Sequence, residues 1–149
     1  MGHKIQTEID IAASPQTVWE ILTGLEQYQD WNPLITSSSG VVAVGEKLTN
    51  RLELPGGKVD TRTVRVTAVE PSRLFEWNGR LLGLSLLFQG RHRLELEDTP
   101  NGARLTHSEE FSGLAAPLIL RKSVVAQIDE GFRMMNNALK ARAEAQANT

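Results

Sequence analysis

The sequence contains no cysteine, and this absence excludes several kinds of function. A chain without a thiol has no disulfide framework, no thiolate nucleophile and no cysteine-based zinc or iron–sulfur site. An excess of one charge is also missing, because the net charge is only −2, so the basic surface typical of nucleic-acid binding is not expected. No stretch approaches the roughly 18 apolar residues that span a bilayer, and residues 1–6 lack the apolar region of a signal peptide. We therefore expect a cytoplasmic protein with no nucleic-acid partner and no integral membrane association.

Aromatic residues are few, eight in 149, so the walls of any cavity should be mostly aliphatic. The length is typical of one domain, and the fractions of hydrophobic and charged residues are those of an ordinary globular protein. We predict a single domain over residues 1–149, with a core of about 5–142 and a frayed tail from Ala143 to Thr149.

The first elements are indicated by local patterns. Alternating apolar and polar residues over 5–11 predict a half-buried strand. Ser14 can cap a helix that begins at Pro15, and we predict that this helix runs over Pro15–Thr23 and ends at Gly24. A second, short helix is expected over Leu25–Asp30, since the proline after Asn32 disfavours a longer one.

Strand-like segments separated by turn residues occupy the middle of the chain. The predicted strands are 40–44, 47–54, 59–70, 74–78, 84–97 and 103–111. Short loops between sequential strands are typical of an antiparallel sheet.

The last element is predicted to be one long helix from Pro117 to about Ala145. Its apolar stripe has a seven-residue spacing with residues between, and comprises Leu118, Val125, Ile128, Phe132, Met135 and Leu139. Gly131 in this helix predicts a close approach of either a strand or a ligand, because glycine there costs up to about 1 kcal/mol relative to alanine.

This order of elements resembles the helix-grip fold of the START-like, Bet v 1-like (SRPBCC) superfamily, and in particular its bacterial polyketide cyclase/dehydrase-type branch. The motifs that carry the resemblance are Ala13-Ser14-Pro15-Gln16-Thr17-Val18-Trp19, Tyr28-Gln29-Asp30-Trp31-Asn32-Pro33, Leu74-Phe75-Glu76-Trp77, Gly90-Arg91-His92 and Thr106-His107-Ser108-Glu109-Glu110-Phe111-Ser112-Gly113. The resemblance implies an α+β fold, β-α-α-β6-α, in which a seven-stranded curved antiparallel sheet wraps around the long C-terminal helix. It implies no single activity, because one scaffold in that superfamily serves binding proteins, transporters and enzymes.

Polar residues interrupt apolar faces of two predicted strands. By alternation, His92 shares a face with Leu84, Leu86 and Phe88, and His107 shares one with Glu109. His92, His107 and Glu109 could therefore converge on adjacent strands, either as part of a ligand site or as a buried structural pair of His92 with Glu109. Spacings typical of metal sites are lacking, and we expect no metal and no other cofactor.

Further candidate ligand contacts come from large apolar residues that would face a cavity between the sheet and the long helix. The complete predicted ligand-binding set is Trp31, Phe75, Trp77, Phe88, His92, His107, Glu109, Val125, Ile128, Phe132 and Met135. Trp19 is assigned to the core. The apolar loop Leu81-Leu82-Gly83-Leu84 would suit a portal lid or a subunit contact.

The preferred function is binding or transport of a small, mainly hydrophobic molecule, such as a polyketide, a lipid or an isoprenoid, by a monomer or weak homodimer. An alternative is a polyketide cyclase or dehydratase, in which His92 removes a proton and Glu109 orients it. A third reading is a protein-interaction or stress-response module that acts through its surface.

Overall fold

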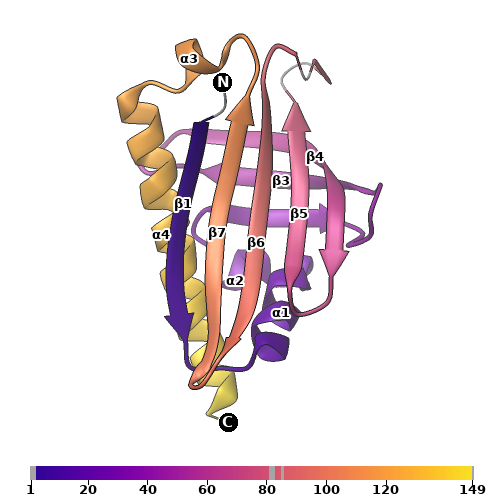
Figure 1. Cartoon of the computed structure of the whole chain (residues 1–149), viewed down its shortest axis with the longest axis vertical. Helices are drawn as coiled ribbons and strands as arrows, with labels where there is room; N and C mark the ends of the chain where they lie inside the picture. Colours follow the sequence, from indigo (N-terminus) through magenta and orange to yellow (C-terminus); the bar gives the residue numbers. More distant parts are fainter. Residues whose placement is uncertain (1–2, 81–82, 85, 149) are drawn as a thin grey trace.

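The structure, a computed structural model, describes residues 3–80, 83–84 and 86–148. Within them, one antiparallel sheet has the strand order β1-β7-β6-β5-β4-β3-β2 (Figure 1). The strands are β1 (His3–Ile11), β2 (Ile35–Gly40), β3 (Lys47–Glu53), β4 (Val59–Glu70), β5 (Leu74–Arg80), β6 (Gln89–Thr99) and β7 (Gly102–Ser112). The helices are α1 (Pro15–Thr23), the 3-10 helix η1 (Leu25–Gln27), α2 (Tyr28–Trp31), α3 (Ala116–Ile119) and α4 (Lys122–Ala147).

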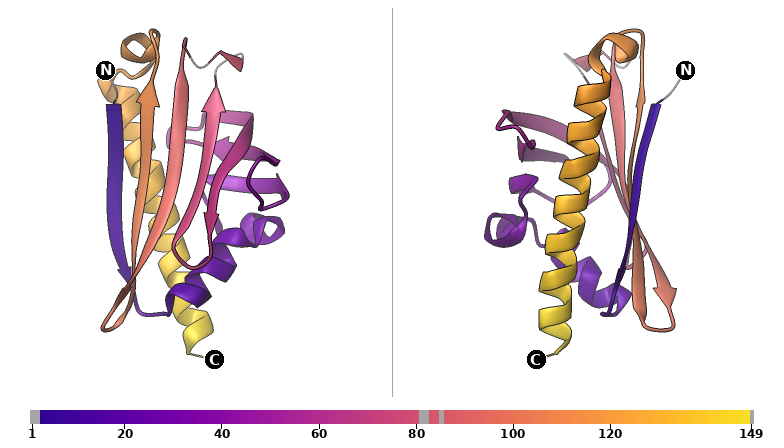
Figure 2. Two further views of the ribbon diagram at one scale, coloured as in Figure 1. Left: turned by 45° about the vertical axis from the view of Figure 1, so that its right-hand side comes forward. Right: turned by 90° about the vertical axis from the view of Figure 1, so that its left-hand side faces the viewer.

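The sheet curves around α4, so that β1 and the β2–β3 end lie on opposite sides of the helix (Figure 2). This is the helix-grip fold that the order of elements predicts.

The N-terminus of α1 has the predicted cap, because the Thr17 backbone N–H donates to the Ser14 hydroxyl at 3.1 Å. Trp19 is half-buried and packs edge-to-face on Phe75, with ring centroids 6.3 Å apart, which places it against the core.

The predicted strand over 40–44 is wrong, since the strand lies earlier, at β2. Gly40 has φ +130°, a conformation that a side chain would strain, and it ends the strand. Inside the strand, the hydroxyl of Ser38 donates to the side-chain oxygen of Asn50 at 2.6 Å, so a serine-rich segment pairs with β3. Val41 and Val44, whose apolar character suggested a strand, are exposed.

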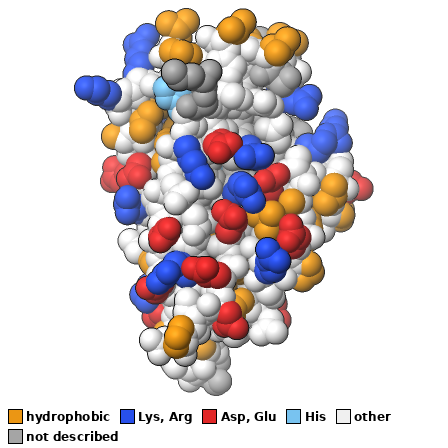
Figure 3. Space-filling model, in the orientation of Figure 1, with side chains coloured by type: hydrophobic (Ala, Val, Ile, Leu, Met, Phe, Trp, Pro, Cys, Tyr) orange, Lys and Arg blue, Asp and Glu red, His pale blue; other side chains and the backbone are white. Residues whose placement is uncertain are grey.

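The predicted strand 84–97 also begins too early, because β6 starts at Gln89. Leu84 and Leu86 are 55% and 83% exposed and lie in the β5–β6 connection, so they do not extend the apolar face of His92. Leu81 and Leu82 of the predicted lid lie outside the described residues. Figure 3 shows hydrophobic side chains at this end of the molecule, over α3.

The long C-terminal helix is interrupted, in contrast to the prediction of one element from Pro117. Arg121 is extended, with ψ 160°, and separates α3 from α4. Because of the break, Leu118 is 74% exposed and does not belong to the apolar stripe. At its other end, α4 is longer than predicted, and Ala143, assigned to the frayed tail, is fully buried.

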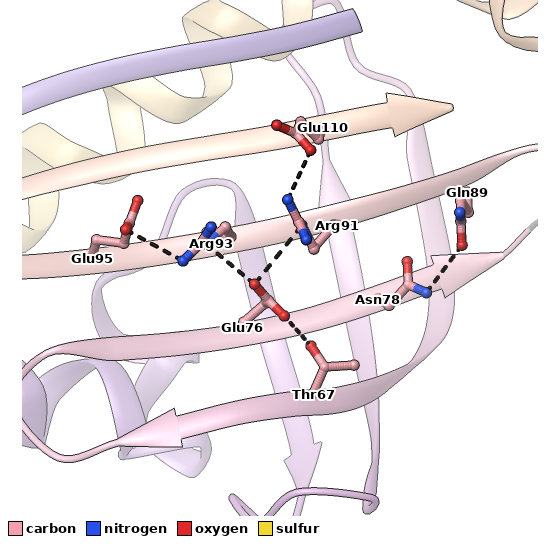
Figure 4. A network of polar contacts seen from close by, with 8 residues as sticks. All are labelled: Thr67, Glu76, Asn78, Gln89, Arg91, Arg93, Glu95 and Glu110. Carbon is pink, nitrogen blue, oxygen red and sulfur yellow. Dashed lines mark hydrogen bonds and ion pairs between the residues drawn. The ribbon is translucent and has the colours of Figure 1, made fainter. Parts of the chain in front are cut away.

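The outer face of the sheet carries polar residues, among them Arg91, Arg93 and Glu95 of β6. Glu76 on β5 accepts from Thr67 on β4 at 2.7 Å and pairs with Arg93 on β6 at 3.2 Å. Arg91 pairs in turn with Glu110 on β7 at 2.8 Å (Figure 4). The inward-facing residues of the same strands are therefore the ones available to a site.

Candidate functional site

A cavity of about 240 Å³ lies between the sheet and the helices α3 and α4. Most of its lining is apolar: Leu34, Ile35, Leu52, Leu54, Val64, Trp77, Gly79, Phe88, Gly90, Phe111, Ile119, Leu120, Val124, Ile128 and Phe132. The other lining residues are Asn50, Lys58, Arg62, His92 and Glu109. Lys58 and Arg62 are exposed, and Arg62 pairs with Asp60 at 2.9 Å, so the polar groups deep in the cavity are Asn50, His92 and Glu109.

The helical wall of the cavity follows from the break before α4. On α4, Val124, Ile128 and Phe132 line the cavity at four-residue spacing, which places them on one helix face. Leu120, at the break, adds its side chain to the same wall and is 8% exposed. Gly131 lets the helical wall approach the segment just before β2, because a Cβ there would lie 2.8 Å from Cδ1 of Leu34, itself a lining residue. This contact provides the close approach that the glycine predicts.

Glu109 and His92 form the polar group on the sheet side of the cavity. They are directly opposite in the β6–β7 register, and His92 Nδ1 lies 3.4 Å from Glu109 Oε1. The second carboxylate oxygen, Oε2, lies over Gly90, where any Cβ would collide with it. Gly90 thus makes room for the Glu109 carboxylate on the cavity wall.

Behind His92, a buried chain of hydrogen bonds crosses from the sheet to α4. His92 Nε2 lies 2.7 Å from His107 Nε2, and His107 Nδ1 lies 2.8 Å from Oδ1 of Asn136 on α4. The Asn136 amide nitrogen donates to the Thr7 hydroxyl at 2.8 Å, and that hydroxyl donates to the His107 carbonyl at 3.2 Å. This His92–His107–Asn136–Thr7 chain ties β6, β7, α4 and β1 together beside the cavity.

The pattern of donors assigns the tautomers of both histidines. Because the single Thr7 proton goes to a carbonyl, the Thr7 oxygen must accept from the Asn136 amide nitrogen, which leaves Oδ1 facing His107. His107 Nδ1 therefore carries a proton. Desolvation, with the charge of His92 as a second cause, holds the pKa of His107 well below its usual value. His107 is thus neutral, its Nε2 accepts, and His92 Nε2 donates to it.

Aromatic rings hold the two imidazoles in place. His92 stacks on Trp77 with centroids 4.4 Å apart and planes 12° apart. His107 stacks on Phe132 of α4 at 4.0 Å and 10°. Since both rings are clamped, the Nδ1 atom of His92 has a fixed direction toward Glu109.

The structure brings six of the predicted ligand-binding residues to the cavity and leaves five outside its lining. Those in the lining are Trp77, Phe88, His92, Glu109, Ile128 and Phe132. Those outside it are Trp31, Phe75, His107, Val125 and Met135. That any of them contacts a ligand stays a prediction.

The five residues outside the lining have physical reasons for their positions. Phe75, His107 and Met135 are fully buried in the core beside the cavity. Val125 is half-buried and packs against the core, and its neighbour Val124 lines the cavity instead. Trp31 lies elsewhere, in a shallow depression with the C-terminal half of α4.

The contacts of His92 and Glu109 bear on the roles that the enzyme hypothesis assigns to them. Both ring nitrogens of His92 face protein partners, His107 and Glu109, so neither is free to take a proton from a ligand. The Glu109 carboxylate, with a 20% exposed side chain, is the group that a ligand can reach. Glu109 would therefore be the base, and His92 the residue that orients it.

Three polar residues of the site were missed by sequence reasoning: Thr7, Asn50 and Asn136. Each is buried, at 2–3% exposure. Asn136 lies one residue after Met135 at the edge of the apolar stripe, and an amide at such a position is the signal that could have indicated a buried network. Thr7 and Asn50 look like ordinary strand residues until their partners are known.

The described residues contain no cluster of three or more histidines and carboxylates arranged to hold a metal ion. Nor do the described helices include one with the length and apolar character needed to cross a bilayer.

The curved seven-stranded sheet around a long C-terminal helix, with a cavity between them, is the Bet v 1-like helix-grip fold. Residues 2–144 match the family described as polyketide cyclase/dehydrase and lipid transport. The chain belongs to this family. No curated protein sequence matches it.

Solved structures share the fold at low sequence identity. NE0264 from Nitrosomonas europaea is 14% identical with a TM-score of 0.77, over 98% of this chain and 97% of that one. Ara h 8.0201 is 16% identical with a TM-score of 0.72, over 97% and 99% of the two chains. The di-domain ARO/CYC protein StfQ of steffimycin biosynthesis is 14% identical with a TM-score of 0.71, over all of this chain and 53% of StfQ. At these identities the likeness concerns the fold alone.

Proposed function

We propose that the protein binds a small, mainly hydrophobic molecule in the cavity between the sheet and α4. The observation that carries the proposal is the mostly apolar lining, in which the deep polar residues of the described part of the chain are Asn50, His92 and Glu109. Binding pockets are typically apolar, with a few polar groups that orient the ligand. Family membership supports the proposal at the level of hydrophobic ligands or polyketide-like compounds.

The size of the cavity narrows the class of ligand. At about 240 Å³, it lies below the range of about 300–1,000 Å³ that is common for drug-sized ligands. A molecule with one or two rings, or a short acyl or isoprenoid chain, fits this volume better than a full-length lipid.

Equilibrium dialysis with naphthalene and with linear compounds of similar size tests the proposal. We expect saturable one-to-one binding of at least one compound by the wild-type protein. Ile128→Trp fills the cavity and should weaken that binding about tenfold or more, about 1.4 kcal/mol. Met134→Trp is the matched control, because Met134 lies on the same helix but is exposed and away from the lining. Absence of binding by every compound, or equal effects of the two variants, would contradict the proposal.

A second candidate function, proton transfer on a polyketide-like carbonyl compound, is favoured by the Glu109–His92 pair. The Glu109 carboxylate would accept a proton from the carbon next to a carbonyl, and the C–H electron pair would pass to the carbonyl oxygen to give an enolate. The test is deuterium exchange of 2-tetralone in D₂O, which needs no further reactant. Catalysed exchange that Glu109→Gln abolishes is the expected result of this function, and exchange at the buffer rate would exclude it for this ketone.

A further inference from the structure

The free oxygen of Glu109 has no partner in the part of the chain that the structure describes. Among the described residues, the Glu109 carboxylate contacts His92 Nδ1 through its Oε1 atom. Oε2 lies over Gly90 on the cavity wall and accepts no hydrogen bond from a described residue. A carboxylate oxygen in a mostly apolar cavity is costly unless it is hydrogen-bonded, so this atom points to a ligand group.

The Oε2 atom of Glu109 decides what kind of group can bind there. His92 Nε2 donates to His107, so Nδ1 is the ring nitrogen of His92 that faces Oε1 of Glu109. Both oxygens of a carboxylate are acceptors only, and Oε2 is the one that faces no described partner. Oε2 is therefore a hydrogen-bond acceptor for a ligand.

We infer that Glu109 Oε2 accepts a hydrogen bond from a hydroxyl group of the ligand, so that the cavity selects small apolar molecules that carry a hydroxyl. This inference rests on the proposed binding function and names the class of ligand. An ether or a ketone offers Oε2 no proton and places its own lone pairs against it, and a hydrocarbon leaves it unpaired.

The opposite wall has a complementary group, which the test must separate from Glu109. Asn50 is 3% exposed and its side-chain oxygen accepts from Ser38, so its amide nitrogen is the atom left to donate to a ligand. An ether oxygen could be bound at Asn50, whereas Glu109 Oε2 needs a donor, which a hydroxyl has and an ether lacks. A comparison of hydroxyl and ether probes of equal shape therefore isolates the Glu109 interaction.

The experiment measures the dissociation constants of 2-naphthol, 2-methoxynaphthalene and naphthalene by equilibrium dialysis. We expect the wild-type protein to bind 2-naphthol about tenfold or more tightly than 2-methoxynaphthalene, as a hydrogen bond to a charged acceptor permits. Glu109→Leu should reduce this ratio to about 1 while naphthalene still binds. Glu110→Leu is the matched control, because Glu110 is the next residue on β7 but pairs with Arg91 on the outer face; it should keep the ratio.

A second variant moves the carboxylate without removing it. In Gly90→Ala, the new Cβ collides with Oε2, the end of a flexible side chain, so Glu109 must turn away and the naphthol preference should fall to about 1. Gly79→Ala adds the same methyl group at the residue opposite Gly90 on β5, where it meets Val64 Cγ1 at 3.3 Å. Gly79 also lines the cavity, and its variant should keep the naphthol preference even if all affinities change.

The outcomes separate the two proposals. If no probe binds, the proposed binding function is contradicted. If the three probes bind equally to the wild-type protein, or if Glu109→Leu and Gly90→Ala keep the naphthol preference, the cavity binds apolar molecules but the assignment of Glu109 is overturned.

Discussion

Asn136 joins α4 to the sheet through the buried chain of hydrogen bonds, and its replacement tests whether that chain contributes to stability. The side chain is 2% exposed and makes two hydrogen bonds of 2.8 Å, to His107 and to Thr7. Leucine is similar in volume, so Asn136→Leu leaves no large void. It does leave the Nδ1 proton of a fully buried His107 without an acceptor.

The expected cost of Asn136→Leu follows from that orphaned donor. A buried donor without its partner costs about 1–3 kcal/mol. Thr7 loses the hydrogen bond from Asn136 but still donates to the His107 carbonyl, so the cost at Thr7 is smaller than the cost at His107. We expect a total of about 1–3 kcal/mol, which is a large part of the 5–15 kcal/mol typical of a domain.

Urea denaturation at pH 7 measures this cost, with Asn137→Leu as the matched control. Asn137 is the next residue of α4 and is exposed, so the same substitution there should change the free energy of unfolding by less than about 0.5 kcal/mol. In a His107→Phe background, Asn136→Leu should cost about 1 kcal/mol less, because no imidazole proton is orphaned. The reasoning is refuted if Asn136→Leu is as stable as the wild type, or if its cost is unchanged without His107.

Two further predictions concern pH and helix packing. Because burial lowers the pKa of His107, the unfolded state binds a proton below about pH 6.5 that the folded state does not, so stability should fall as the pH decreases from 7 to 5. His107→Phe should flatten this decrease by up to about 1.4 kcal/mol per pH unit, measured by urea denaturation across that range, and an unchanged slope would contradict the assignment. Gly131→Ala should not give the full helix-propensity gain of about 1 kcal/mol in the wild type, where the new Cβ meets Leu34, but should raise stability in a Leu34→Ala background. Equal effects of Gly131→Ala in both backgrounds, again by denaturation, would show that Leu34 does not oppose it.

The fold could be predicted because its main signals are local. Ser14 and Pro15 mark a helix start, and the turn residues around Pro55 and Pro71 separate strands whose sequential pairing then follows. The errors in the elements arose where tertiary contacts override local preference. The serines of β2 form a strand because they pair with β3, and the apolar Leu84 and Leu86 do not form one because they have no partner strand.

The site could be predicted only in part. Alternation places His92 and Glu109 on inward faces, and the antiparallel register brings them opposite each other. Alternation cannot show that His107 occupies the second ring nitrogen of His92, because this depends on which rotamers the packing allows. The contribution of Asn136 depends on the rotation of α4 against β1 and β7, which no local pattern specifies.

The central claim is that an apolar ligand occupies the cavity with a polar group at Glu109, and a crystal structure of the protein with 2-naphthol tests it most directly. The account predicts the two rings inside the cavity, against its apolar lining, with the hydroxyl oxygen within about 2.5–3.0 Å of Glu109 Oε2. Density for the naphthol at the surface, with the cavity empty, would contradict the claim of a binding cavity. A naphthol inside the cavity with its hydroxyl turned away from Glu109, toward Asn50 or Lys58, would contradict the role of Glu109.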